Sequence, residues 1–345
     1  MVSTFREAGR GPCFVVGNSR SGTTMLARML GRRDGAFAFN ELHFYGQLWD
    51  DRDCGRVLAP DAAIDVFSRL MNHQRAGYFN RDPDISQFYD EARTALEPVG
   101  GSLTASGVFG EFLYYEAARH DATLPVEQTP RDVFYIDAIF QEFPQATVVV
   151  MVRDPRAVLL SQKGKWKRRK LGEPNTLLVE TARAWFNYHP VVTSRLWNAA
   201  VDAGDRWADD PRVVLVHFEA LLRDPERELA RICDRLGIAL RSEMLEVPRV
   251  SSSNAPDSGA VGIDVERADA WRTGGLDAGE IWVCERLTSK RMERHGYAPT
   301  GTRASWLGVA FQLLLLPAKL TGALLLNLGQ IKSLTGTIRR RLGRV

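Results

Sequence analysis

The feature that most constrains this chain is a glycine-bounded loop between an apolar run and a segment with helical apolar spacing. It extends from Gly17 to Thr24 and reads GNSRSGTT. This spacing matches the phosphate-binding pattern G-x-x-x-x-G-K-[ST], in which backbone N–H groups hold an anion at a helix N-terminus. Thr23 takes the place of the pattern's lysine, and Arg20 is the only cation inside the loop. We therefore expect an anion-binding loop, but not that of an NTPase.

Strands and helices alternate along the predicted fold. Continuous apolar runs predict strands buried on both faces of a parallel sheet, at Cys13–Gly17, Thr147–Val152 and Val213–Phe218. Apolar residues at helical spacing predict helices over Thr23–Leu30, Val133–Phe143, Thr176–Val201, Pro225–Leu236 and Gly279–His295. This alternation is typical of an α/β fold, here a P-loop-like open parallel sheet with helices on both faces. We expect it to occupy residues 1–302.

Residues 44–125 interrupt this alternation and are rich in aromatic side chains. We interpret them as a mostly helical insertion over the carboxyl-end edge of the sheet, on the side where an acceptor substrate would enter. Any single aromatic residue could equally belong to the core. The acceptor itself cannot be identified from this segment.

Composition is that of an ordinary globular protein, with 45% hydrophobic and 25% charged residues. The four cysteines are far apart in the sequence. They indicate neither a zinc site nor a disulfide framework, and they favour a reducing, cytoplasmic compartment. Residues 1–12 contain no apolar stretch, so we expect no secretory signal.

A second candidate anion site follows the strand at Thr147–Val152. Arg153 stands directly after this strand, and Asp154-Pro155 is a helix start with proline near the first position. Ser161 lies two turns further along that helix. An arginine and a hydroxyl that converge beyond a strand end can bind an anion, although this segment alone would also suit a simple helix cap. Two anion sites on one sheet predict a ligand with phosphates at two ends.

The two motifs together resemble those of the sulfotransferases that use 3′-phosphoadenosine-5′-phosphosulfate (PAPS), in particular the bacterial and tyrosylprotein-type branches. Gly17–Thr24 resembles their 5′-phosphosulfate loop, and Arg153 with Ser161 matches the spacing of their 3′-phosphate motif. The resemblance covers most of residues 13–298. It implies transfer of a sulfuryl group to an acceptor, release of 3′,5′-ADP, and no metal. The donor-binding residues that it implies are Ser19, Arg20, Ser21, Gly22, Thr23, Thr24, Arg153, Ser161, Phe218, Ser252, Ser253, Trp271 and Arg272.

An acceptor hydroxyl needs a general base. Glu41 lies 21 residues after Arg20, the spacing at which similar chains carry their catalytic glutamate, and it is the preferred candidate. His43 is the second candidate, and Glu41 could also be a simple helix cap. Arg20 is the residue expected to neutralise the bridging and sulfonate oxygens.

Two positions depart from the family's pattern. Similar bacterial chains read Glu-Lys-Thr-Pro where this chain reads EQTP, so Gln128 replaces a lysine that looks catalytic by resemblance. Three explanations stay open: Arg20 suffices, Lys163 or Lys165 reaches the site, or turnover is weak. Phe218 replaces a tyrosine, which would keep stacking on an adenine and lose a hydroxyl bond.

The segment from Lys163 to Lys170 carries six positive charges. It could be a solvated helix face, or it could face an anion such as the donor's 3′-phosphate, a glycan or lipid headgroups. We expect no nucleic-acid partner, since no recognition motif accompanies the charges.

The tail, residues 303–345, differs from the rest of the chain. It has seven Lys or Arg residues and no Asp or Glu, so a net charge of +3 for the whole chain leaves −4 for residues 1–302. The stretch 306–328 is apolar apart from a narrow polar stripe that, at helical spacing, comprises Gln312, Lys319, Asn327 and Gln330. We expect a helix that lies peripherally at the inner membrane face. The rivals are a tail that packs on its own domain and one that pairs in a homodimer.

Two further functions stay open from the sequence. One is a membrane-associated protein that binds PAPS or 3′,5′-ADP with weak or lost catalysis, an idea that Gln128 motivates. The other is a P-loop kinase, against which Thr23 in the lysine position already argues. The leading hypothesis is a sulfotransferase acting on a carbohydrate, lipid or glycolipid.

Overall fold

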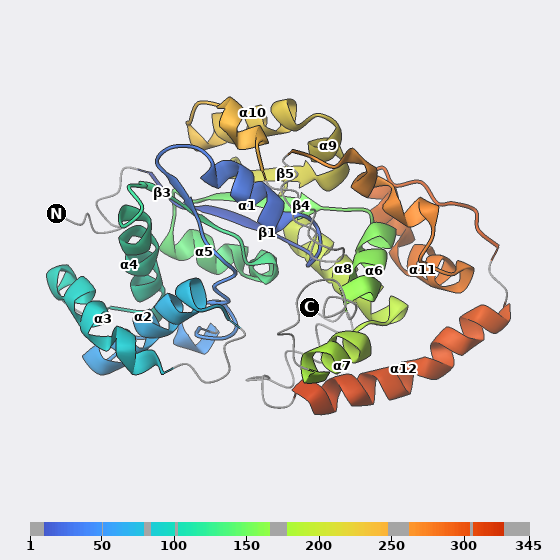
Figure 1. Cartoon of the computed structure of the whole chain (residues 1–345), viewed down its shortest axis with the longest axis horizontal. Coiled ribbons are helices and arrows are strands. Elements are labelled where there is room, and N and C mark those ends of the chain that lie inside the picture. Colours follow the sequence, from blue (N-terminus) through green and yellow to red (C-terminus); the bar gives the residue numbers. More distant parts are fainter. Residues whose placement is uncertain are drawn as a thin grey trace.

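The computed structural model of the chain describes residues 10–49, 51–78, 84–100, 103–165, 178–247, 262–303 and 306–327. Within these residues one open sheet has the strand order β2-β3-β1-β4-β5, and all neighbouring strands are parallel. Figure 1 shows helices on both sides of this sheet, as predicted for an α/β fold. The strands are β1 (Cys13–Gly17), β2 (Ala36–Ala38), β3 (Leu124–Glu127), β4 (Thr147–Val152) and β5 (Val213–His217).

Burial explains which strands were predictable. All residues of β1 and β4 are buried, which is why their sequences are continuous apolar runs. β5 ends at His217, one residue earlier than predicted, because Phe218 begins a helix. The sequence did not reveal β2 and β3, which have only three and four residues. β3 also contains Pro125, a residue that usually argues against a strand.

Two hydrophobic clusters cover the two faces of the sheet. One contains side chains of α1 and α10, such as Leu26 and Leu229. The other contains side chains of α4, α5 and α8, such as Phe109, Ile139 and Trp197. The α-helices are α1 (Thr23–Gly31), α2 (Pro60–Arg75), α3 (Tyr89–Leu96), α4 (Ala105–Ala118), α5 (Ile136–Glu142), α6 (Pro155–Lys163), α7 (Leu178–Asn187), α8 (Pro190–Asp205), α9 (Phe218–Arg223), α10 (Pro225–Leu236), α11 (Ala278–Arg294) and α12 (Trp306–Asn327).

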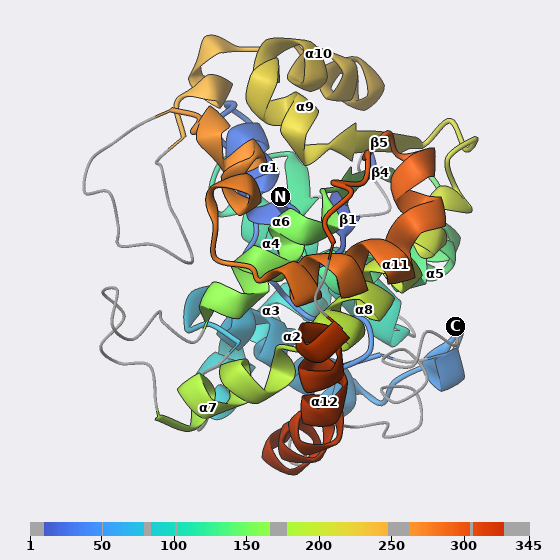
Figure 2. The same cartoon turned by 90° about the vertical axis from the view of Figure 1, so that its right-hand side faces the viewer.

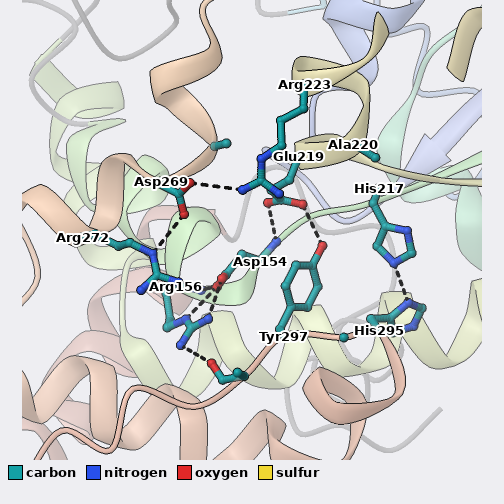
Figure 3. Close-up of a pocket in the computed structure, with 13 residues that line it drawn as sticks. Asp154, Arg156, His217, Glu219, Ala220, Arg223, Asp269, Arg272, His295 and Tyr297 are labelled. Carbon is teal, nitrogen blue, oxygen red and sulfur yellow. Dashed lines mark hydrogen bonds and ion pairs between the residues drawn. The ribbon is translucent and has the colours of Figure 1, made fainter. Parts of the chain in front are cut away.

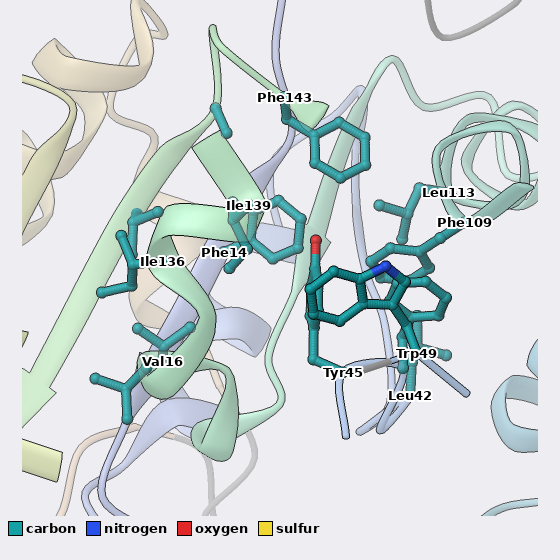
Figure 4. Packing of buried hydrophobic residues seen from close by; sticks show 14 of the residues in the cluster. Phe14, Val16, Leu42, Tyr45, Trp49, Phe109, Leu113, Ile136, Ile139 and Phe143 are labelled. Carbon is teal, nitrogen blue, oxygen red and sulfur yellow. The ribbon is translucent and has the colours of Figure 1, made fainter. Parts of the chain in front are cut away.

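The described part of residues 44–125 contains α2, α3 and α4 and ends in β3. Several of its aromatic rings pack into the core. Phe44 stacks on Phe109 with ring centroids 4.2 Å apart, and Phe109 contacts Phe14 of β1. Figure 4 shows this cluster with Tyr45 and Trp49 beside the sheet. These aromatic side chains therefore hold the helices to the sheet.

Two predicted helices are divided differently in the structure. The helix expected over Thr176–Val201 is α7 and α8, because His189 is extended and Pro190 starts a new helix. Residues 176 and 177 lie outside the described part. The helix expected over Val133–Phe143 begins as a 3₁₀ turn at Pro130–Tyr135 and becomes α5 only at Ile136.

Helix α12 packs on α7 and α11 (Figure 2), and two of its polar side chains point inward. Gln312 is 8% exposed and donates to Asp277, and Lys319 is 7% exposed and donates to the carbonyl of Trp185. The ring of His189 donates to the carbonyl of Gln312. The outward face carries large apolar side chains that are 51–78% exposed, namely Trp306, Leu307, Phe311, Leu313, Leu314 and Leu325. The polar stripe therefore joins the helix to the protein.

By its length and apolar composition, Trp306–Leu326 could cross a membrane. It is the single such helix among the described residues.

Candidate functional site

The loop after β1 has the backbone of an anion-binding loop, and its two glycines are required for different reasons. Gly17 has φ +144°, and a Cβ there would lie 2.3 Å from the carbonyl oxygen of Met151. Gly22 has φ +93°, and a Cβ there would lie 2.3 Å from the ring of Phe218. Both conformations are ones that only glycine adopts readily. Helix α1 begins directly after Gly22, so its free N–H groups face the loop.

The loop and the second motif meet. Arg20 Nε donates to Ser161 Oγ at 2.9 Å, although the two residues are 141 positions apart in the sequence. Arg153 donates to the carbonyl oxygen of Arg20 at 2.9 Å and to that of Arg267 at 3.1 Å. Its guanidinium lies 4.3 Å from the ring centroid of Phe218. The four residues Arg20, Arg153, Ser161 and Phe218 therefore lie together at the carboxyl ends of β1, β4 and β5.

Among the residues that the structure describes, two buried polar atoms of this site have no hydrogen-bond partner, namely Arg153 Nε and Ser21 Oγ. Burial lowers the pKa of Arg153, which reports the cost of holding a cation away from water. A buried donor without a partner is costly, and an anion bound here would satisfy both groups. The residues present thus fit a donor that carries phosphate groups.

The other loop residues have separate positions. Ser19 is exposed at the tip, whereas Thr23 is buried at the first turn of α1. Thr24 Oγ1 donates to Gln128 Oε1 at 3.0 Å. Gln128, the residue in place of a lysine, is therefore held directly by the loop.

The two candidate bases are in contact with each other. His43 Nε2 lies 3.2 Å from Glu41 Oε2, and the Glu41 side chain is 43% exposed while that of His43 is 15% exposed. Burial pushes the pKa of Glu41 upward, but the hydrogen bond from His43 and the charges of His43, Lys165 and Arg20 outweigh burial and lower it. A partly exposed carboxylate that stays ionised can accept a proton from a bound hydroxyl.

A buried carboxyl that no sequence pattern indicated supports the loop that carries Glu41 and His43, which we call the base loop. Glu127, fully buried at the end of β3, accepts from the backbone N–H of Thr129 at 2.9 Å and from its hydroxyl at 2.5 Å. Thr129 Oγ1 in turn accepts from the backbone N–H of His43 at 3.2 Å. Burial raises the pKa of Glu127 to about 7. The position of Glu127 at a strand end was the available signal, but β3 was too short to be recognised.

Lys163 and Lys165, the two lysines that could supply the charge missing at Gln128, have different surroundings. Lys163 Nζ is 2.6 Å from the carboxylate of Glu280 on α11. Lys165 acts electrostatically on Glu41. Residues 166–170 of the basic segment, and the predicted donor ligands Ser252 and Ser253, lie outside the described residues.

Arg272 lines a cavity of about 390 Å³ together with Asp154, Glu219 and Asp269 (Figure 3). Arg156 stacks on the Trp271 ring at 4.0 Å, and Arg272 pairs with Asp269 at 2.9 Å. These contacts of Trp271 and Arg272, the two predicted ligands, do not involve the loop at Gly17–Thr24.

No cluster of His, Cys, Asp and Glu side chains suited to a metal ion occurs within the described ranges.

Known proteins share this sequence pattern. Residues 12–242 match the sulfotransferase family. The omega-hydroxy-beta-dihydromenaquinone-9 sulfotransferase Stf3 of Mycobacterium tuberculosis is 23% identical over 256 residues, which is 66% of this chain and 63% of that protein. The nodulation protein NoeE of Sinorhizobium fredii is 25% identical over 162 residues, which is 45% of this chain and 31% of that protein. The match thus spans less than two thirds of the length of these relatives.

Among solved structures, the sulfotransferase domain from the curacin biosynthetic pathway aligns with a TM-score of 0.47 and 18% identity, covering 82% of this chain and 97% of that domain. The family match alone extends over more than half of the sequence and includes the loop, Glu41, Arg153 and Ser161. The chain therefore belongs to the sulfotransferase family.

Proposed function

We propose that this protein transfers a sulfuryl group from PAPS to a hydroxyl group, or an amine, of a carbohydrate, lipid or glycolipid acceptor and releases 3′,5′-ADP. The observation that carries the proposal is the 2.9 Å hydrogen bond between Arg20 and Ser161, which joins two anion-binding motifs beside a candidate base. Sulfuryl transfer, like phosphoryl transfer, depends mainly on positioning and on electrostatic stabilisation. Both are properties that this cluster of residues can supply.

The chain's own residues have distinct roles in this proposal. When bound, PAPS supplies a sulfuryl group attached to a phosphate. The N–H groups that follow Gly22 and the guanidinium of Arg20 would balance the negative charge of the donor's oxygens. Arg153 and Ser161 would hold its second phosphate. Glu41, ionised because its pKa is lowered, would take the proton of the acceptor hydroxyl, while His43 at 3.2 Å orients the carboxylate.

A thermal-shift titration with 3′,5′-ADP tests donor binding. We expect the melting temperature of the wild-type protein to rise with ligand concentration, because binding to the folded state alone stabilises it. Arg153→Ala should lose most of this rise. Arg56→Ala is the matched control, since Arg56 is an exposed arginine paired only loosely with Asp53 at 3.8 Å. A wild-type protein that does not respond to 3′,5′-ADP would refute the proposal.

A lipid-like acceptor is favoured within this proposal. The relative Stf3 is named for the sulfation of a hydroxylated menaquinone, and α12 exposes an apolar face on the present chain. Release of 3′,5′-ADP, measured with candidate lipid and sugar alcohols, identifies the acceptor class. Turnover of water-soluble sugars with none of the lipids would exclude the lipid class.

The location that we propose is the cytoplasm, peripherally at the inner membrane face, with α12 as the contact. Its outward face carries six large apolar side chains, and the remaining tail sequence is basic. An apolar helix face with flanking basic residues suits the interface of an anionic membrane. Co-flotation with vesicles containing phosphatidylglycerol is the test. Protein that stays at the bottom of the gradient would contradict this location, as would dimerisation through the same face.

A second candidate function is a PAPS- or 3′,5′-ADP-binding protein with little or no catalysis. The observation that favours it is the Thr24–Gln128 hydrogen bond, because an uncharged amide lies beside the donor loop where a lysine would add charge. Normal binding of 3′,5′-ADP, no product with any acceptor, and no effect of Glu41→Ala would together favour this candidate.

A further inference from the structure

Helix α7 lies between α12 and the candidate base. Arg183 on α7 donates two hydrogen bonds, at 3.0 and 2.8 Å, to the carbonyl oxygen of Leu326 at the end of α12. The side chain of Lys319, one of the two polar groups at the α12 interface, lies over the ring of Trp185 on the same helix. Helix α7 therefore holds the last turns of α12.

Helix α7 also lies within electrostatic range of a neighbour of the candidate base. Burial raises the pKa of the Tyr78 phenol, and the charges of Arg131 and Arg183 act against that rise, so both guanidinium groups lie within electrostatic range. The Tyr78 ring contacts the His43 ring at a tilt of 44°, with centroids 4.1 Å apart, and His43 contacts Glu41. Leu326 is thus hydrogen-bonded to Arg183, the charge of Arg183 acts on Tyr78, and Tyr78 contacts His43 beside Glu41.

The exposed surface of α12 is almost entirely apolar, and the sequence that follows it is basic. Among its described exposed residues the side chains are apolar apart from Thr321, and its two buried polar side chains, Gln312 and Lys319, point toward the protein. The sequence from 328 to 345 adds five basic residues and no acidic one. Apolar side chains beside positive charge complement a bilayer with anionic headgroups.

We propose that the acceptor reaches Glu41 directly from an anionic bilayer, entering beside Tyr78 and α7 at the end of α12. This inference rests on the proposed sulfotransferase function and specifies its substrate as an amphiphile that keeps its hydrocarbon chain in the bilayer. An interfacial helix lies at the boundary between headgroups and acyl chains, so a hydroxyl at headgroup level is already near the height of the site. Extraction of the whole lipid, which would expose its methylene groups to water, is unnecessary.

Site-specific fluorescence quenching tests this geometry without knowledge of the acceptor. Cys54 is the exposed cysteine among the four, so Cys54→Ser leaves Cys13, Cys233 and Cys284, which are buried. Single labelling sites are then added as Ala76→Cys, which is exposed at the end of α2 near Tyr78, and as Leu314→Cys on α12. The control is Leu240→Cys, 38% exposed in the segment after α10, the helix on the opposite side of the molecule in Figure 1.

Each labelled protein is mixed with phosphatidylglycerol vesicles that contain a lipid spin-labelled near its headgroup. We expect strong quenching at positions 314 and 76 and none at 240. Quenching at 314 without quenching at 76 would mean that α12 binds the membrane while the site faces elsewhere, and would overturn the inference. Absence of quenching at 314, or equal quenching at all three positions, would also overturn it.

The same proteins separate this inference from the proposed function. Each labelled variant is titrated with 3′,5′-ADP in the thermal-shift assay, where an unchanged response shows that the donor site is intact. Loss of quenching with a normal response to 3′,5′-ADP would refute only the bilayer entrance. A protein that is quenched as expected but never binds 3′,5′-ADP would refute only the sulfotransferase proposal.

Discussion

The carboxylate of Glu41 is the residue on which catalysis should depend most. Glu41→Gln keeps the size of the side chain and an oxygen for His43, but it removes proton acceptance. We expect kcat to fall by about 10²–10⁴-fold, the usual contribution of a general base, with unchanged binding of 3′,5′-ADP. Release of 3′,5′-ADP under saturating donor measures the rate. A variant with wild-type kcat would exclude Glu41 as the base.

His43 should control the pH at which Glu41 works. The hydrogen bond and charge of His43 are the leading contributions that lower the pKa of Glu41 against the effect of burial. His43→Ala leaves burial with less opposition, so the pKa of Glu41 rises. Because the base must be deprotonated, the acid limb of the kcat–pH profile should move to higher pH. His120→Ala, which removes a ring stacked on Phe37, should leave the profile in place.

Residue identity was enough to predict which residues of the two motifs lie together, but not the residues that hold them in place. Arg20, Arg153, Ser161 and Phe218 meet as expected because each follows a recognisable strand or motif. Glu127 could not be assigned, because its role depends on Thr129 and the base loop, which approach it only in the folded chain.

At the scale of an element, the turn between β1 and α1 requires Gly22. Gly22→Ala combines a left-handed φ of +93° with a Cβ that would lie 2.3 Å from the Phe218 ring. We expect a lower melting temperature and a loss of 3′,5′-ADP binding. Gly100→Ala is the matched control, since its φ is +55° but nothing lies within 4 Å of the added Cβ. The control should cost about 1–3 kcal/mol and retain binding. Equal binding by both variants would contradict a role of Gly22 in the site.

The end of β3 should make stability depend on pH in an unusual direction. Burial raises the pKa of Glu127 from 4.5 to about 7, so the folded protein favours the protonated carboxyl. This contribution to stability is complete below pH 4.5 and is lost as pH rises through about 7. Chemical denaturation should show that Glu127→Gln flattens the decline between these pH values. The free energy of unfolding of both proteins would fall in parallel if Glu127 did not titrate.

Elements with strong patterns were predictable, and elements defined by their neighbours were not. β1 and β4 are continuous apolar runs because both faces of the sheet are covered. β2 and β3 have too few residues to form a pattern. The break between α7 and α8 was visible in Pro190, which starts the second helix, but the surrounding apolar spacing obscured it.

At the scale of the whole molecule, the spacing of polar residues in the tail predicted a helix but not its orientation. The polar stripe with Gln312 and Lys319 was visible in the sequence, and the helix is present. Its orientation was not predictable, because the partners Asp277 and Trp185 come from distant parts of the chain. These contacts direct the polar side chains inward and the leucines outward.

Membrane binding should therefore have two separable contributions, one apolar and one electrostatic. Leu314→Asp places a charge at a position that is 78% exposed and should weaken flotation with both neutral and anionic vesicles. Replacing Arg339, Arg340 and Arg341 by alanine should leave neutral vesicles unaffected. On phosphatidylglycerol vesicles it should cost about 3 kcal/mol, at about 1 kcal/mol for each basic residue, which is roughly a 100-fold loss of partitioning. Added salt should reduce the wild-type protein to the level of the triple variant on anionic vesicles, since screening removes only the electrostatic contribution. If Leu314→Asp weakened flotation with anionic vesicles only, α12 would lie beside the bilayer without inserting its apolar face.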